Sequence, residues 1–462
     1  MKSPEKLYEG NIRKKYLLFA IPLILSALLS QSYSVINSMM VGKFIGSEAF
    51  AATAVTQQFT ELVNSLFFGY LTGIGIYVSV LFGKGDYAKM LNVIKLNFLF
   101  TTVATVLVVI GCNVFYVPLF DLLNVGADVY QEAAAYFRMH AFAYFFLQFS
   151  WGFVYISNGM GMTKLPLTAS IVSGVLNVFF NYLFLGVMGK GIAYSALATV
   201  LANAVVSVFY IVTYIRLFRR MSIPLGGLHF YKDDLKKSFS YGAPSMFQQM
   251  AMYACTAVVS PLTNTCSTAA ISGYAIANKA QSLIAAIYQN SSKANTNFIA
   301  QAMGAKKLDK IKQGIKIGIA QGLAFFGVTL LLFVVFARPF TALFLDPVKD
   351  ALSFEVSVNI IRFLLPLIFF NVFNNLFHGI FRAVGSGTLM FISTLIYAIS
   401  FVIYAYALFH VLPTDYKIYG VHLALGAAYI TEVIFATVIY FTGKWKTPAY
   451  RAMEAEHQGG QL

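Results

Sequence analysis

Charged residues are scarce in this chain: Asp, Glu, Lys and Arg make up 11% of its 462 residues, whereas hydrophobic residues make up 58%. So little charge cannot cover the surface of a water-soluble protein of this length. The apolar residues recur in long runs over the whole chain rather than in one place. The sequence therefore excludes a soluble two-domain protein and predicts an all-α polytopic membrane protein.

Cysteine is rarer still, since the chain has only Cys112, Cys255 and Cys266. The three residues are isolated from one another, lie in or beside apolar runs and lack the spacing of metal ligands. This pattern excludes a disulfide framework and a zinc site. We interpret the cysteines as packing residues.

Apolar runs long enough to cross a bilayer predict twelve transmembrane helices, six in each half of the chain. The first run is too long for a signal peptide, so we expect it to be retained as a span. The predicted helices lie near residues 16–41, 49–80, 93–119, 133–157, 165–187, 191–217, 238–263, 268–302, 315–337, 356–381, 388–412 and 419–442.

The basic residues are distributed unevenly over the predicted loops. If both termini are cytoplasmic, the inner loops and tails hold 24 of the 33 Lys and Arg. This satisfies the positive-inside rule and predicts a cytoplasmic membrane location with both termini inside. The net charge of +15 then reflects topology and attraction to an anionic inner leaflet, and we expect no nucleic-acid partner.

A faint internal repeat relates the two halves of the chain at a shift of about 221 residues. The shift aligns the region from Ile45 with the region from Cys266, and Gly83 and Gly304 lie where the aligned predicted helices end. With a drift of a few residues it also pairs Pro22 with Pro244, Arg138 with Arg362 and Gly161 with Gly385. We therefore predict two pseudo-symmetric six-helix bundles, an N-terminal lobe over 1–225 and a C-terminal lobe over 226–462.

Several short motifs, in this order and spacing, resemble those of the multidrug and toxic compound extrusion (MATE) family, and most closely its DinF-like prokaryotic branch. The likeness covers nearly the whole chain. The motifs are Asn37 to Gly46 (NSMMVGKFIG), Phe82 to Asp86 (FGKGD), Asn158 to Pro166 (NGMGMTKLP), Asn177 to Tyr182 (NVFFNY), Gly191 to Thr199 (GIAYSALAT), Ala277 to Lys279 (ANK) and Ala300 to Ala305 (AQAMGA).

This resemblance implies a two-lobed, twelve-helix antiporter that exports small organic, often cationic, compounds in exchange for Na⁺ or H⁺. No other cofactor is implied, and we expect a monomer. The cation site of the N-terminal lobe maps onto Asn37, Asn177, Asn181 and Thr199. Asn37 stands where the family pattern has Asp, so this pocket lacks a group that titrates near neutral pH and cannot carry a proton. Its amide oxygens could still bind Na⁺, with less charge to attract it.

Only two of the 18 acidic residues, Glu61 and Glu432, fall inside predicted spans. An ionisable residue in a span is costly and suggests a function. Glu61 lies near the middle of the bilayer in a polar stripe made of Gln57, Gln58, Asn64 and Ser65. Such a stripe favours an aqueous cleft, and we predict Glu61 to be the main coupling carboxylate. The alternative is that Glu61 forms only a structural pair.

Lys279 and His378 complete the predicted cleft or gate, and Glu432 stays outside it. Lys279 aligns with Gln58 in the repeat and could meet Glu61 as a gate or an ion pair, or stay apart from it. His378 could contact substrate or serve as a packing residue. Glu432 has no polar stripe on its own helix, so we interpret it as structural.

Two other functions remain open at this stage. Flipping of a lipid-linked precursor would need a basic cleft for a pyrophosphate, but only Lys279 and Lys293 lie deep in the spans. A membrane-embedded enzyme would need a His, Ser or carboxylate constellation, and the sequence shows none. We therefore expect a transporter and not an enzyme.

Overall fold

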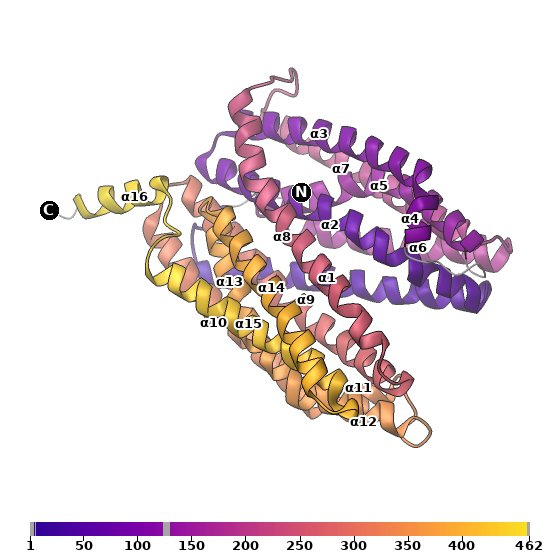
Figure 1. Ribbon diagram of the computed structural model, residues 1–462. Coiled ribbons are helices and arrows are strands. Elements are labelled where there is room, and N and C mark those ends of the chain that lie inside the picture. Colours follow the sequence, from indigo (N-terminus) through magenta and orange to yellow (C-terminus); the bar gives the residue numbers. More distant parts are fainter. Residues whose placement is uncertain (1–3, 5, 123–129, 460–462) are drawn as a thin grey trace. The chain divides into compact units, whose positions relative to one another are not determined.

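The computed structural model describes residue 4 and residues 6–122 and 130–459; within these ranges the side chains of residues 34, 35, 38, 47–51, 54, 55, 58, 59 and 122 are left out. The described chain is helical and contains no strand. Twelve long helical segments, one for each predicted span, make up most of it (Figure 1), and the prediction of twelve helices is confirmed.

In the first half these segments are α1 (Ile12–Phe44), α2 (Ser47–Lys84), α3 (Tyr87–Val114), α5 (Tyr130–Gly159), α6 (Lys164–Asn181) with the π-helical turn η1 (Tyr182–Val187), and α7 (Ala193–Arg220). In the second half they are α8 (Lys232–Asn264), α9 (Thr268–Gly304), α10 (Leu308–Val335), the composite α12–η2–η3–α13 (Ala351–Asn359, Ile360–Leu364, Leu365–Ile368 and Phe369–Ala383), α14 (Gly387–Val411) and α15 (Lys417–Phe441). The short elements are α4 (Tyr116–Leu122), α11 (Ala337–Ala342), η4 (Thr414–Tyr416) and α16 (Pro448–Gly459).

The third helix begins earlier than its apolar run suggests. We predicted it near 93–119, but Asp86 accepts a hydrogen bond from the Lys89 amide and caps a helix that starts at Tyr87. Apolar length marks what lies in the bilayer, whereas caps decide where a helix begins.

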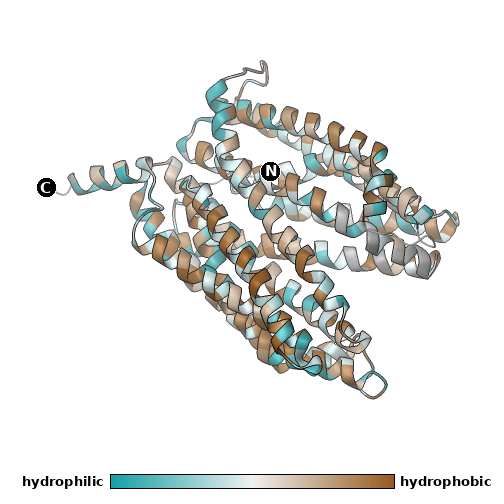
Figure 2. Ribbon diagram, in the orientation of Figure 1, coloured by the Kyte–Doolittle hydropathy of each residue, from teal (hydrophilic) through white to brown (hydrophobic). Residues whose placement is uncertain are grey.

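Nine of the helical segments in the described chain are apolar and long enough to cross a membrane on composition alone. The others, α5, α8 and α9, are as long but carry more polar side chains, many of them buried in α9. Brown hydrophobic residues cover much of the long helices in Figure 2, whereas the C-terminal α16 is mostly teal. Polar residues on long buried helices are expected where a membrane protein builds its sites.

The chain packs into two units. Unit 1 consists mainly of Leu25–Met246, and unit 2 consists of Tyr8–Ile24 with the chain from Phe247 onward. The first part of α1 is fastened in unit 2, where the Tyr16 hydroxyl donates to the Ser291 carbonyl at 2.8 Å. The chain therefore passes from one unit to the other within α1 and again within α8. The lobe boundary predicted from the repeat, 225/226, lies in the connection before α8 and stays a prediction.

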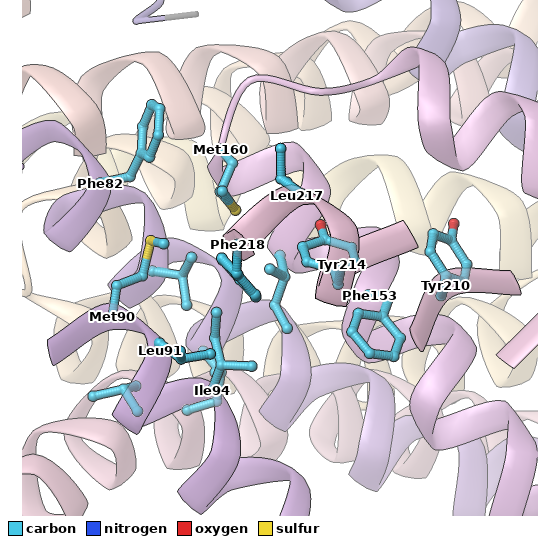
Figure 3. Close-up of a cluster of buried hydrophobic side chains, with 14 of the residues drawn as sticks. Phe82, Met90, Leu91, Ile94, Phe153, Met160, Tyr210, Tyr214, Leu217 and Phe218 are labelled. Atoms are coloured by element: carbon cyan, nitrogen blue, oxygen red, sulfur yellow. The ribbon is translucent and has the colours of Figure 1, made fainter. Parts of the chain in front are cut away.

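Close helix packing explains why the start of α8 belongs to unit 1. Added Cβ atoms on Gly69 and Gly73 of α2 would overlap backbone atoms of Met246 and Tyr241 on α8. Only glycine allows two helix backbones to approach this closely. Nearby, the core of unit 1 gathers aromatic side chains such as Phe153 and Tyr214, whose rings stack 4.8 Å apart (Figure 3).

The backbone supports the repeat at the ends of its aligned helices. Gly85 (φ 81°) and Lys306 (φ 55°), which are 221 residues apart, both take the left-handed conformation just after α2 and α9. The next repeat pair, Gly161 and Gly385, has φ values of 78° and 89°. Gly304, where we placed the helix end, is the last residue of α9, and the left-handed turn falls two residues later, on a lysine.

Lys306→Gly is expected to stabilise the protein by about 1 kcal/mol, because a side chain at positive φ is strained and glycine is not. The measurement is thermal or denaturant unfolding in detergent. Lys312→Gly, at an exposed position inside α10, serves as the control and should lower stability by about 1 kcal/mol. A loss of stability in Lys306→Gly would contradict the assignment of strain.

Candidate functional site

A cluster of amide and hydroxyl groups, which we call the amide pocket, forms in unit 1 from the residues predicted as a cation site. Asn177 and Asn181 lie one turn apart at the end of α6, and the Asn181 side-chain nitrogen donates to the Asn177 Oδ1 at 3.1 Å. The Asn177 Nδ2 donates in turn to the Thr199 Oγ1 on α7 at 3.1 Å. Three of the four predicted residues are thus joined in one network.

The fourth residue, Asn37 on α1, joins the pocket through a residue that sequence reasoning missed. The Ser195 hydroxyl reaches the Asn37 Oδ1 at 3.5 Å, the limit of a hydrogen bond, and the Ser195 carbonyl accepts from Thr199 at 3.4 Å. Ser195, Thr199 and Asn203 follow each other at four-residue intervals on α7. This polar stripe was the signal that could have identified Ser195.

The local helix geometry shapes this pocket. Immediately after Asn181 the helix widens into the π-helical turn η1, a deviation that is frequent at functional sites. The Asn181 Oδ1 is buried and has no hydrogen-bond partner. One amide oxygen is therefore available to a ligand, while those of Asn177 and Asn37 already accept hydrogen bonds.

Glu61 lies in a second polar region of unit 1, in the middle of α2. Its side chain is half-buried. The Tyr144 hydroxyl donates to the carbonyl of Thr60 at 3.3 Å. A tyrosine hydroxyl can donate a hydrogen bond to a carbonyl or a carboxylate oxygen.

The rest of the predicted stripe on α2 is mixed. Gln57 is exposed, Asn64 is half-buried with an Oδ1 that has no partner, and the Ser65 hydroxyl is bound to the Leu62 carbonyl at 2.6 Å. The side chain of Gln58 lies outside the described residues. An aqueous cleft beside Glu61 stays a prediction.

Unit 2 contains a buried polar chain that sequence analysis did not assemble. On α13, the His378 Nε2 approaches the Glu432 Oε1 of α15 to 3.2 Å, an ion-pair distance at which neither atom completes a well-aligned hydrogen bond. The His378 Nδ1 is 3.0 Å from the Gln248 Nε2 of α8. Arg382 donates to the other end of Gln248, with its Nη2 2.6 Å from the Oε1.

This chain joins an acid and two basic groups across three helices. His378 and Glu432 are both almost fully buried, which is costly for any charged form without a partner. The contacts agree with the structural interpretation of Glu432. They also place His378 in a polar network, and a substrate contact for it stays a prediction.

Lys279, predicted as a gate partner of Glu61, is an exposed residue of α9 in unit 2. Its amine lies 5.3 Å from the ring centroid of Phe344 in the same unit, a cation–π distance. Glu61 belongs to unit 1. The pairing of the two residues stays a prediction.

The MatE family model matches residues 22–183 and 244–407, which together form well over half of the chain. The chain belongs to the MatE family. The two matched stretches fall one in each half, as the internal repeat predicts, and the resemblance to MATE transporters is confirmed.

Bacterial relatives match along much of the length of this MatE protein. It is 26% identical over 353 residues to the probable multidrug resistance protein YoeA of Bacillus subtilis, covering 74% of this chain and 75% of the relative. It is 23% identical over 447 residues to the probable multidrug resistance protein YpnP of the same organism, covering 95% and 97%. With the multidrug export protein MepA of Staphylococcus haemolyticus it shares 22% over 391 residues, covering 84% and 85%.

Solved MatE-type structures share the fold. An outward-facing multidrug resistance MATE family transporter superposes with a TM-score of 0.87 at 19% identity, covering 98% of this chain and 99% of that one. A MATE protein solved in complex with MaL6 gives 0.88 at 18% identity, covering 98% and 100%. The two-bundle, twelve-helix architecture predicted from the sequence is therefore confirmed as the MATE fold.

The described part of this MatE chain offers no metal centre of the usual kind. Among residues 6–122 and 130–459, no three His, Cys, Asp or Glu side chains are grouped so that they could hold a metal ion. Na⁺ needs no such cluster, because several amide, hydroxyl, carboxylate and backbone carbonyl oxygens can together supply its ligands.

Proposed function

We propose that this protein exports small organic cations across the cytoplasmic membrane by antiport with Na⁺ or H⁺, using alternating access between its two lobes. Membership of the MatE family supports the proposal, as do relatives whose names describe multidrug export and multidrug resistance. MepA is named an export protein, so we propose that this chain moves its substrate without changing it chemically, as a monomer and with no cofactor beyond the driving ion.

The observation that carries the coupling proposal is the half-buried Glu61 carboxylate in the middle of the long helix α2. A carboxylate inside a membrane span can hold a proton, a metal cation or an organic cation, but only one of them at a time. Binding of the driving ion and of the substrate then exclude each other, which is what antiport requires.

The amide pocket supports coupling less well. Its oxygens mostly accept hydrogen bonds from one another, and a Na⁺ ion bound there would have to displace them. The unpartnered Asn181 Oδ1 is the observation in its favour. We therefore assign the coupling ion to Glu61 and leave the pocket as the second candidate.

Proteoliposomes test the function directly. Uptake of a fluorescent organic cation should follow an imposed gradient of either Na⁺ or H⁺, and the gradient that drives it identifies the coupling ion. A lipid-linked precursor, added instead of the dye, is the control substrate. Dye uptake that is the same with and without either gradient, together with translocation of the precursor, would favour the flippase alternative.

The proposed orientation has its own test. In a variant without Cys112, Cys255 and Cys266, a cysteine at Asp415 should react with an impermeant thiol reagent added outside intact cells. A cysteine at Gly226 should react only after the membrane is opened. The reverse pattern would place both termini outside.

A further inference from the structure

The connection between α7 and α8 is held tightly against α3 in unit 1. The Lys95 amine donates to the carbonyl oxygens of Leu225 at 2.6 Å, Gly227 at 2.9 Å and Gly226 at 3.4 Å. One ammonium group therefore gathers three consecutive carbonyls of the loop. Charge-assisted bonds of this kind are stronger than neutral ones and fix the path of the backbone.

Two more side chains of α3, Asn92 and Lys89, hold the same connection and the start of α8, and follow Lys95 at three-residue intervals toward the start of the helix. We call the contacts of these three residues the clamp. Asn92 brackets His229, donating to its carbonyl at 2.9 Å and accepting from its amide at 3.0 Å. Lys89 forms an ion pair with the buried Asp234 of α8 at 2.6 Å. Residues at this spacing share one helix face, so the loop is fastened along a continuous edge of α3.

The position of the clamp fixes the depth of the loop in the membrane. One turn after Lys95, α3 presents exposed apolar side chains, beginning with Leu99, Phe100 and Val103. On α8, Phe239 is also exposed and packs on Phe100 with ring centroids 5.0 Å apart. Exposed apolar surface on a membrane helix faces lipid tails, so the loop beside it lies at the level of the headgroups.

The clamp leaves the tip of the loop exposed with apolar side chains. Phe230 is 72% exposed and Tyr231 57%, and the neighbouring Leu228 is exposed as well. Aromatic side chains at the boundary between lipid tails and water insert among the headgroups. A loop that only connected two helices would not need exposed aromatic side chains at its tip.

The flanks of this tip are strongly basic. Six exposed cations surround it, three at the end of α7 and three at the start of α8: Arg216, Arg219, Arg220, Lys232, Lys236 and Lys237. Over the same stretch of chain the exposed carboxylate is Asp233, because Asp234 is buried in its pair with Lys89. The excess of positive charge fits an anionic surface.

We propose that Leu228–Tyr231 and these six cations form a docking surface for the anionic headgroups of a bilayer leaflet, which we name the lipid-docking loop. The aromatic tip enters the headgroup layer, the cations hold anionic lipids around it, and α3 sets its depth. Each basic residue near an anionic surface adds to the attraction, so the preference for anionic over neutral lipid should be several-fold.

Fluorescence of Phe230→Trp in nanodiscs tests the loop. The protein is placed in discs that contain brominated phosphatidylglycerol or, at the same mole fraction, brominated phosphatidylcholine. The signal is the fluorescence gained over the parent protein, which already contains Trp151 and Trp445. Both faces of a nanodisc have the same lipids, so the result depends neither on the proposed orientation nor on transport.

We expect the brominated anionic lipid to quench the added tryptophan at least about twofold more than the neutral lipid, and high salt to reduce this difference. Arg219→Gln with Arg220→Gln and Lys232→Gln should remove the preference. The matched control, Lys306→Gln with Lys312→Gln and Lys316→Gln, neutralises three exposed lysines of unit 2 and should keep it.

Two outcomes would overturn the proposal. Equal quenching by both lipids would show that the loop meets the bilayer without selecting anionic headgroups. Quenching by a water-soluble quencher alone would place Phe230 in solvent, where a soluble partner rather than lipid would have to cover it.

Discussion

Glu61→Gln is expected to abolish ion-driven export of an organic cation, with a fall of at least about a hundredfold in the gradient-dependent rate. The amide keeps the shape of the side chain but can neither release a proton nor attract a cation by charge. Downhill exchange of substrate need not require the carboxylate and can persist. The measurement is dye uptake into proteoliposomes with and without the gradient, at matched protein content.

Asn37→Ala is the matched control within the same unit. It removes an oxygen of the amide pocket and leaves Glu61 unchanged. If Glu61 carries the coupling, coupled export should therefore remain close to that of the unaltered protein. The opposite pattern, normal export by Glu61→Gln and none by Asn37→Ala at normal expression, would return the coupling role to the pocket of Asn37, Asn177, Asn181 and Thr199.

His378→Leu should destabilise the protein by about 3–5 kcal/mol, because it leaves the buried Glu432 carboxylate without its ion-pair partner. Unfolding in detergent by denaturant measures the loss.

Two further variants separate the buried charge from simple loss of packing. His378→Leu combined with Glu432→Leu should be less destabilised than His378→Leu alone, since no charge remains to be buried. His422→Leu changes another buried histidine of unit 2, whose Nδ1 has no partner, and should cost clearly less. Equal losses in His378→Leu and His422→Leu, with no recovery in the double variant, would show that the His378–Glu432 contact is not an ion pair.

The amide pocket shows how far sequence reasoning reached into the sites. Asn177, Asn181 and Thr199 were found by resemblance, and the structure joins them by hydrogen bonds. Ser195 was missed although its spacing from Thr199 and Asn203 was visible in the sequence. Resemblance transfers the residues to which a family pattern gives a role, and it passes over Ser195, which lies inside the Gly191 to Thr199 motif without such a role.

The partners of Glu432 could not have been predicted in the same way. Periodicity reports which residues share a face of one helix, and the helix of Glu432 has no polar stripe. Its partner His378 lies on α13, and Gln248, 184 residues before Glu432, lies on α8. Only the packing of three helices brings these side chains together.

The sequence by itself determined that the chain is a membrane protein with twelve helices in two related halves, because apolar length and the repeat are local properties of the chain. It also singled out Glu61 and Glu432, because charge is rare in such helices. The tertiary structure decided which half each segment joins. The beginning of α1 and the beginning of α8 each pack into the unit of the other half, since contacts such as those of Gly73 and Tyr16 depend on neighbours far away in sequence. It also decided that Lys95 fastens the α7–α8 connection to α3, because a lysine in a basic run shows its partners only when the chain is folded.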